Sequence, residues 1–230
     1  MAWTLLTWNI RGAARPDLVD LAAVIGDYEP DVVLLQEVWR RQALRIAHAA
    51  GFAHSFWTFK HSPFGPVLPI RAEGMAILSR SPLEETSSEV LTPAARSWTH
   101  RRRIVQYAQV PSLGVWVANV HLASHAEVDD RTSQAGIVAT QLRSTPGPWV
   151  VAGDFNAADE PAVWKPFADI GVTDAWAGGA GFTNPSGAVR QRLDRVLVGA
   201  GLVARSVEVP DDGPAWVHRS DHLPVIARID

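Results

Sequence analysis

Short apolar runs alternate with amphipathic stretches along the whole chain. Three stretches place apolar residues at the three- and four-residue spacing of a helix. The first is expected to begin at Pro16 and end before Pro30, the second to span about 40–50 with Gly51 as its C-terminal cap, and the third to span about 126–143. The pattern therefore predicts three helices, well separated along the sequence.

Between these helices, short apolar runs predict strands. They are residues 2–8, 32–36, 74–79, 103–110, 115–120, 149–152, 193–198, 202–209 and 223–229. Residues 103–110 and 114–121 form a predicted hairpin, because the joining loop is too short for a crossover connection. A wholly parallel sheet is therefore disfavoured, and we expect two sheets packed face to face with helices outside. No linker or internal repeat divides the sequence, so residues 1–230 are expected to form a single domain.

Composition excludes several classes of protein. Hydrophobic residues make up 47% and charged residues 20%, as in globular proteins and unlike disordered or coiled-coil chains. The chain has no cysteine, which excludes a disulfide scaffold and a thiolate metal site. A net charge of -3 predicts no strong general affinity for nucleic acid. The apolar runs are too short for a membrane span, and the N-terminus lacks a signal-peptide pattern, so a cytoplasmic protein is expected.

Candidate chemistry lies where the apolar runs stop. Several runs are bounded by a residue that can bind a metal or move a proton. These residues are Asn9, Glu37, His121, Asp154 with Asn156, Asp194, and Asp221 with His222. Each alone has an ordinary explanation as a turn former, a buried histidine or half of a salt bridge. Together they indicate a shared pocket, because carboxylates are costly to bury unpaired. We expect them to meet at a single sheet edge.

The donor atoms in this set suggest a metal. Carboxylate and amide oxygens suit Mg²⁺ or Mn²⁺, whereas two histidines without cysteine make a structural zinc site a poor fit. Such a metal would hold phosphate oxygens and stabilise charge that develops during displacement at phosphorus. A histidine paired with a carboxylate supplies an acid or base near neutral pH. The pocket is thus suited to chemistry on phosphate esters.

Seven segments resemble the motifs of the endonuclease/exonuclease/phosphatase superfamily, which includes deoxyribonuclease I, exonuclease III-type abasic-site nucleases, neutral sphingomyelinases and inositol polyphosphate 5-phosphatases. They are residues 7–10, 34–38, 73–80, 119–122, 153–157, 192–196 and 220–225. Their order and spacing carry the resemblance across nearly the whole chain. It implies a four-layer α/β sandwich of two mixed β-sheets flanked by helices, and a divalent-metal-dependent phosphoester hydrolase.

The resemblance also implies roles for particular residues. Glu37 would be the principal ligand of Mg²⁺ or Mn²⁺, with Asn9 beside it and Asp221 nearby. Asp154 and Asn156 would orient the attacking water or contact the scissile phosphate, and Asp154 is a candidate base.

Two histidines complete the implied catalytic set. His222 would lie against the phosphate, oriented by Asp194, as a base or an electrostatic stabiliser. His121 matches the second histidine of the deoxyribonuclease I and sphingomyelinase branches, and Glu73 lies where the nuclease branch has the glutamate paired with that histidine. His121 therefore argues against the abasic-site branch.

Other residues are candidates for substrate binding. Residues 101–103 are the densest basic run, and they either form a solvated loop or bind phosphate. The candidates are Arg41, Arg103, Trp176 and Trp216, together with Phe182. The aromatic side chains would stack on bases or line an apolar pocket.

Three functions remain open at this stage. The favoured one is a phosphodiesterase that acts on DNA or RNA by in-line attack of water. The alternative is a phosphatase or phosphodiesterase for a small-molecule or lipid-headgroup phosphate. A non-catalytic binding module is disfavoured because the complete acidic and histidine set is present. A monomer is expected, since the sequence shows no evident protein partner.

Overall fold

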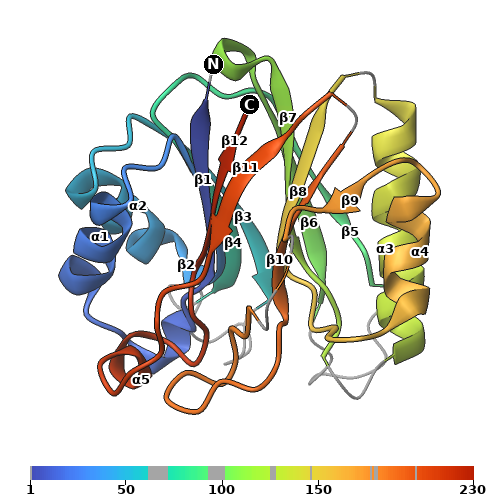
Figure 1. Ribbon diagram of the computed structural model, residues 1–230. Helices are drawn as coiled ribbons and strands as arrows, with labels where there is room; N and C mark the ends of the chain where they lie inside the picture. Colours follow the sequence, from blue (N-terminus) through green and yellow to red (C-terminus); the bar gives the residue numbers. More distant parts are fainter. Residues whose placement is uncertain are drawn as a thin grey trace.

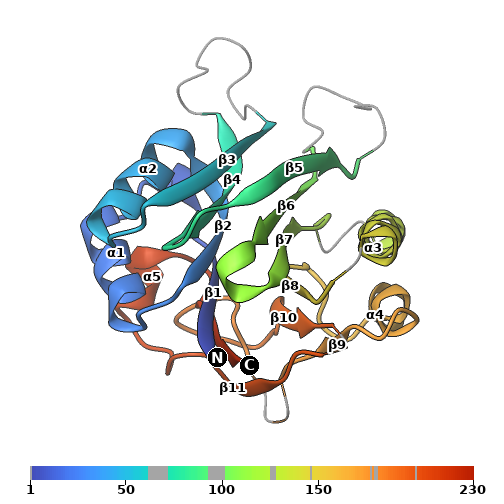
Figure 2. The same ribbon diagram turned by 90° about the horizontal axis from the view of Figure 1, so that it is seen from above.

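Two packed β-sheets form the centre of the protein, and helices cover both outer faces. The computed structural model describes residues 2–61, 72–92, 102–124, 128–145, 147–176, 178, 181–199 and 201–230. Within them, each sheet has six strands, and Figures 1 and 2 show the two sheets between two helical layers. The predicted four-layer α/β sandwich is confirmed.

Both sheets are mixed. The first has the order β11 (Ala204–Glu208), β12 (Val225–Ile229), β1 (Trp3–Asn9), β2 (Val32–Trp39), β4 (Glu73–Ser79) and β3 (His54–His61). The second has the order β5 (Glu84–Val90), β6 (Ile104–Val110), β7 (Val115–His121), β8 (Trp149–Asp154), β10 (Asp194–Val198) and β9 (Thr173–Asp174). Strand β1 is parallel to β2, and β7 is parallel to β8. The predicted hairpin is β6 and β7, which pair antiparallel across the 3₁₀ turn Pro111–Leu113.

The helices lie outside the sheets. Helices α1 (Leu18–Asp27) and α2 (Arg40–Ala49) lie beside the first sheet, and α3 (Val128–Ser144) and α4 (Pro161–Ala168) lie beside the second (Figure 2). A short helix α5 (Trp216–Arg219) precedes β12. None of the described helices has the length and apolar character needed to cross a membrane.

The three predicted helices are present, with one boundary corrected. Helix α1 begins at Leu18, after Pro16, because the Asp17 side chain accepts hydrogen bonds from Val19 N and Asp20 N and so caps the helix. Gly51 follows α2 with φ +75°, the left-handed conformation common after a helix C-terminus.

Five elements were not predicted: β3, β5, β9, α4 and α5. Strand β5 is exposed throughout and so lacks apolar alternation, and β9 has only two residues. Helix α4 contains Pro161 and Pro166, which read as loop residues in the sequence. Strand β3 is an edge strand whose apolar pattern is interrupted by Lys60.

The contact between the sheets changes from apolar to polar toward the carboxyl ends of β1 and β2. Leu5, Val32 and Val150 belong to one buried apolar cluster between the sheets. Further along, Gln36 Nε2 donates to Asn119 Oδ1 at 2.7 Å, and Asn119 Nδ2 donates to Gln106 Oε1 at 2.9 Å. These buried amides link the sheets with directional hydrogen bonds, which fix the register of one sheet against the other.

Gly153 permits the closest approach of β7 and β8 and directly precedes Asp154. Its φ is +145°, and a Cβ atom there would lie 2.0 Å from the carbonyl oxygen of Val120. Gly153→Ala is therefore expected to lower the free energy of unfolding by about 3 kcal/mol, the upper end of the usual cost of overpacking. Gly136→Ala is the matched control, because nothing lies within 4 Å of its Cβ position and alanine favours a helix. Urea denaturation of both variants measures the difference, and equal stabilities would contradict this assignment.

Candidate functional site

The predicted polar residues meet where strands of both sheets end together. Figure 1 shows β1 running down from the N-terminus and β12 running up to the C-terminus, so the end of β1 and the start of β12 lie toward the same end of the molecule. Asn9 Nδ2 donates to Asp154 Oδ2 at 3.0 Å, and this bond joins the first sheet to the second. We expected these residues to meet at the edge of one sheet. Instead, the cluster is formed by strand ends of two sheets that pack face to face.

Glu37 is presented to the cluster by an irregularity in β2. The pairing of β2 with β4 shifts register between Leu35 and Val38, and Glu37 has φ +53°. A left-handed glutamate inside a strand costs free energy and persists where the surroundings demand it. Its side chain is 17% exposed, with Oε1 3.9 Å from His121 Nε2. Within the described residues the Glu37 carboxylate accepts no hydrogen bond, so its oxygens are available to a cation.

Asp154 lies at the centre of the cluster. It is buried, and Oδ1 accepts a hydrogen bond from Asn156 N at 2.8 Å while Oδ2 accepts one from Asn9. The same Oδ2 lies 3.6 Å from His121 Nε2 and 4.0 Å from His222 Nε2. Burial, opposed by His222 and reinforced by Asp194, raises the pKa of Asp154. A carboxylate held between two imidazoles in this way can exchange protons with a bound water.

His222 is oriented by Asp194, as the resemblance implied. His222 Nδ1 lies 2.7 Å from Asp194 Oδ2, and Asp194 is fully buried at the start of β10. Burial lowers the pKa of His222, but the carboxylates of Asp194 and Asp154 outweigh it and raise that pKa to about 10. The arrangement therefore holds a positively charged imidazole with Nε2 directed toward Asp154, where it can stabilise a phosphate.

Asp221 and Asn156 lie at the margins of this cluster. Asp221 is 37% exposed at its side chain, and its Oδ2 is 3.3 Å from Arg11 Nη1. Asn156 has φ +52° and donates from Nδ2 to the carbonyl oxygen of Leu122 at 3.1 Å, which ties the loop after β8 to the loop after β7. Asp221 is therefore already partnered by Arg11, whereas the amide of Asn156 is fixed in place beside Asp154.

The surroundings of His121 differ from the expected pairing with Glu73. Lys60 Nζ lies between them, 2.8 Å from Glu73 Oε1 and 3.2 Å from His121 Nδ1. On the other side of the ring, Arg103 Nη1 is 2.6 Å from Nε2. The predicted direct contact between His121 and Glu73 is therefore wrong, because Lys60 lies between the two side chains and contacts both. Sequence reasoning missed Lys60, although a lysine among the aromatic residues of β3 was a signal.

The structure places the substrate-binding candidates in different surroundings. Arg103 is 2% exposed and belongs to the cluster, while Arg101 lies outside the described residues. Arg41 is exposed on the first turn of α2, so its side chain is accessible to a ligand that approaches from the solvent. Trp176 stacks under the guanidinium of Arg192 at 5.3 Å.

The structure places Trp216 in the core, which corrects the prediction that its side chain binds substrate. Its side chain is 8% exposed and packs edge-on against Trp8, with ring centroids 5.8 Å apart. Its Nε1 donates to the carbonyl oxygen of Asp211. We therefore leave Trp216 out of the proposed substrate-binding residues. Phe182 is 39% exposed and remains a candidate.

The donor atoms fit a hard divalent cation. Glu37 supplies a carboxylate that accepts no hydrogen bond within the described residues, and the Asp154 carboxylate and the Asn9 amide supply further oxygens on the other side of His121 Nε2. Asp154, Asp194 and His222 also place potential ligand atoms within 4.8 Å of one another. That second group is less suitable, because Asp194 Oδ2 and His222 Nδ1 are already paired at 2.7 Å, which leaves Asp194 Oδ1 as its only oxygen without a hydrogen-bond partner in the described part of the chain. We therefore place the candidate metal centre at Glu37 rather than at Asp194.

A buried arginine holds the two loops that carry the site. Arg131 on α3 is 0% exposed, and its Nη2 lies 2.7 Å from Glu160 Oε1. The same guanidinium donates to the carbonyl oxygens of Ala123 and Ser124, which follow His121. Because Glu160 belongs to the loop after β8, Arg131 joins the loop after His121 to the loop after Asp154.

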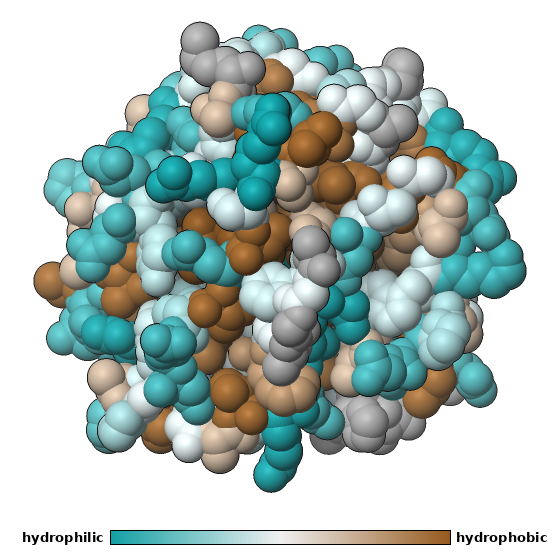
Figure 3. Space-filling view, viewed as in Figure 1, coloured by the Kyte–Doolittle hydropathy of each residue, from teal (hydrophilic) through white to brown (hydrophobic). Residues whose placement is uncertain are grey.

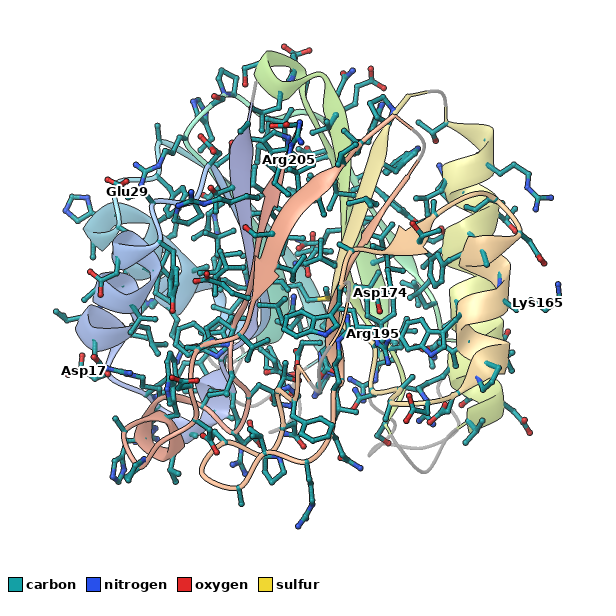
Figure 4. All side chains as sticks on the ribbon, in the orientation of Figure 1. Asp17, Glu29, Lys165, Asp174, Arg195 and Arg205 are labelled. Atoms are coloured by element: carbon teal, nitrogen blue, oxygen red, sulfur yellow. The ribbon has the colours of Figure 1, made fainter. Side chains whose placement is uncertain are left out.

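Arg131→Met is expected to lower the free energy of unfolding by about 3 kcal/mol, since it breaks a buried ion pair and leaves carbonyls unpaired. The exposed pair of Lys165 and Asp169, 2.7 Å apart on α4 and labelled at Lys165 in Figure 4, provides the control. Lys165→Met is expected to change stability by less than about 1 kcal/mol. Thermal melting compares the two variants, and equal losses would contradict the role given to Arg131.

A second buried cluster supports the loop after β8 from the other side. Arg195 donates to the carbonyl oxygen of Ala158 and lies 2.7 Å from Asp174 Oδ2, and Figure 4 shows Arg195 and Asp174 side by side. In contrast to these buried charges, hydrophilic and hydrophobic residues are interspersed over the face seen in Figure 3.

Comparisons with known proteins agree with this architecture. The sequence model of the Endonuclease/Exonuclease/phosphatase family matches residues 6–222. None of the curated proteins compared matches the chain.

Among solved structures, an endonuclease/exonuclease/phosphatase from Bacteroides vulgatus is similar over 100% of this chain and 99% of its own, with TM-score 0.82 and 19% identity. A mannosyl-6-phosphatase from Bacteroides thetaiotaomicron covers 99% of both chains, with TM-score 0.74 and 17% identity. D. rerio TDP2 complexed with single strand DNA product covers 100% of this chain and 99% of its own, with TM-score 0.75 and 17% identity. At these sequence identities, the similarities show that the folds are alike.

Proposed function

Because the chain belongs to the Endonuclease/Exonuclease/phosphatase family, we propose that it is a divalent-metal-dependent phosphoester hydrolase that uses the site at the strand ends. The observation that carries the proposal is the meeting of Asn9, Asp154 and two histidines across the two sheets. A buried carboxylate between imidazoles, with a strongly shifted pKa, is an arrangement typical of acid–base chemistry in an active site.

The residues have distinct tasks in the proposed reaction. Asp154, hydrogen-bonded to Asn9 and to the backbone of Asn156, orients the attacking water and accepts its proton. His222, charged and fixed by Asp194, faces the phosphate from Nε2 and stabilises the negative charge that builds up on its oxygens. Arg103 adds a second positive group next to His121. In-line attack then needs only positioning and charge stabilisation.

Glu37, with Asn9 beside it, would hold the metal. A bound Mg²⁺ or Mn²⁺ supplies Lewis-acid polarisation of a phosphate oxygen. Glu37 is suited to bind this cation, because the bulge in β2 directs its carboxylate to the cluster and no described residue donates a hydrogen bond to it. Asp221, which is paired with Arg11, is the more distant candidate ligand.

The proposed substrate is a phosphodiester of nucleic acid. Arg41 and the exposed aromatic ring of Phe182 provide groups of the kind that contact a strand, and D. rerio TDP2 binds a single-strand DNA product. One observation favours a small-molecule phosphate instead. Arg103, from the basic run expected either to form a solvated loop or to bind phosphate, is buried beside His121 rather than displayed on the surface.

A substrate panel separates these candidates. Supercoiled plasmid DNA, bis-p-nitrophenyl phosphate, p-nitrophenyl phosphate and a sugar phosphate are incubated with the protein in Mg²⁺ or Mn²⁺, and with a chelator as the blank. Nicking of the plasmid and cleavage of the diester, both abolished by the chelator, are the expected results. Cleavage of the monoesters alone would establish the small-molecule alternative, and inactivity on all four would contradict the proposal.

A further inference from the structure

His222 lies outside the helices and strands, in the turn between α5 and β12, so regular secondary structure does not hold its backbone. Asp194 fixes the ring at Nδ1, but the ring also moves with the backbone that carries it. His222 is 6% exposed, and buried backbone N–H and C=O groups need hydrogen-bond partners. The groups that bind its backbone therefore help to decide where Nε2 lies.

The side chains of Trp8 and Ser220 supply these partners. Trp8 Nε1 donates to the carbonyl oxygen of His222 at 2.8 Å, and His222 N donates to Ser220 Oγ at 3.2 Å. The Ser220 hydroxyl in turn donates to the carbonyl oxygen of Asn9 at 2.6 Å. Asp221 Oδ1 is 3.5 Å from this hydroxyl and too distant to compete for its proton. Because a hydroxyl can donate and accept at the same time, Ser220 bridges the backbones of Asn9 and His222.

Both anchors lead to the last two residues of β1. Successive side chains of a strand point to opposite faces, so Trp8 and Asn9 reach different neighbours. Asn9 Nδ2 donates to Asp154 Oδ2 at 3.0 Å, and His222 Nε2 lies 4.0 Å from the same oxygen. The end of β1 therefore contacts Asp154 through one side chain and the backbone of His222 through the other. These contacts fix the separation of the two groups that act in the proposed reaction.

We propose that Trp8 and Ser220 are positioning residues for this reaction: they hold the backbone of His222 against the end of β1 and so direct Nε2 into the site. Trp8 is 0% exposed and Ser220 is 3% exposed, so both act through His222 and not on the substrate. Their effect on catalysis rests on the proposed function, whereas their effect on the placement of the His222 ring does not. A purely structural role would change stability and leave both the rate and the ring unchanged in the folded protein.

Trp8→Phe tests the first contact, because it removes the indole N–H and keeps an aromatic ring in the core. The variant is expected to lower kcat on the best substrate of the panel by about 10- to 100-fold, as a small misplacement of a reacting group does. KM is expected to change little, since the residue is buried.

Trp149→Phe is the matched control for Trp8→Phe. Trp149 is 5% exposed and also donates Nε1 to a backbone carbonyl oxygen, that of Thr145 at 3.1 Å. It begins β8, whereas Asp154 ends that strand, so the lost hydrogen bond is remote from the site. The control is expected to keep the wild-type kcat. Equal kcat values for the two variants, at equal folded fractions, would overturn the role of Trp8.

Ser220→Ala tests the second contact in a double-mutant cycle. It removes the bridging hydroxyl and is expected to lower kcat by a similar factor of about 10 to 100. In the His222→Ala background the same change is expected to have no further effect, because no ring is left to position. Effects that multiply in the double variant would show that Ser220 acts independently of His222.

Ser79→Ala is the matched control for Ser220→Ala. Ser79 is buried, and its Oγ also accepts the backbone N–H of the residue two positions later, from Ser81 at 3.1 Å. It pairs with Val32 at the start of β2, away from Glu37. The control is expected to keep the wild-type kcat, and a loss equal to that of Ser220→Ala would overturn the role of Ser220.

Carbon–proton correlation NMR of the histidine rings tests the placement of His222 without any substrate. Comparison with His222→Ala identifies the His222 signals. Ser220→Ala is expected to shift or broaden them, and Ser79→Ala is expected to leave them unchanged. Unchanged His222 signals in Ser220→Ala, or an equal change in both variants, would overturn the proposal. A wild-type protein that hydrolyses no substrate of the panel would remove the proposed function, and the spectra would then decide alone whether Ser220 places the ring.

Discussion

Replacing His222 with alanine is expected to lower kcat by about 10²- to 10⁴-fold while the protein remains folded. The imidazole is held at 2.7 Å by Asp194 and directs Nε2 toward Asp154, so its loss removes the fixed positive charge that faces the phosphate. The variant also leaves Asp194 buried without its partner, and a lower melting temperature is expected with it. Initial rates of diester cleavage at saturating Mg²⁺ measure the effect.

The matched control is His218→Ala. His218 is exposed on α5, four residues before His222, and makes no contact with the cluster. It is expected to keep the wild-type kcat. Equal rates for both alanine variants, at equal folded fractions, would remove His222 from the reaction.

The second large effect is expected at Glu37. Glu37→Ala removes the unpartnered carboxylate that the bulge of β2 directs into the site, and with it the proposed principal metal ligand. Loss of about 4 kcal/mol of charge stabilisation corresponds to a decrease of about 10³-fold in kcat. Activity plotted against Mg²⁺ concentration is expected to rise steeply in the wild type and to stay near the blank in the variant.

Glu84→Gln is the matched control for Glu37. Glu84 is exposed on the edge strand β5, so its replacement removes a negative charge without touching the site. It is expected to leave the metal dependence unchanged. A Glu37→Ala protein that responds to Mg²⁺ like the control would show that the metal is held elsewhere.

Much of the architecture could be predicted because its signals are local. The strands β1, β7 and β8 are nearly continuous apolar runs that end in Asn9, His121 and Asp154, and the apolar run of β2 stops at Gln36 and Glu37. The joint position of Asn9 and Asp154 followed from those endings. What the endings did not reveal is that the two residues belong to different sheets, since sheet membership depends on long-range pairing.

The errors around His121 have a physical cause of the same kind. Strand β3 pairs with β4 at the edge of its sheet, and its hydrophobic pattern is weak because most of its residues are only partly buried. Lys60 was therefore not selected from the sequence, and in three dimensions it lies between Glu73 and His121. From the sequence we expected Trp216 to lie in a loop and to be available to a substrate. It lies instead at the start of the short helix α5, and its side chain packs against Trp8 in the core.

The central claim is that one site, at the meeting of the two sheets, hydrolyses phosphoesters with a divalent metal. The most direct measurement removes the metal with a chelator, dialyses the protein, and follows diester cleavage as Mg²⁺ is added back to the wild type and to Glu37→Ala. The account predicts no turnover in the stripped wild type, full recovery with Mg²⁺, and no recovery in the variant. Turnover by the stripped wild type, or equal recovery in both proteins, would contradict it.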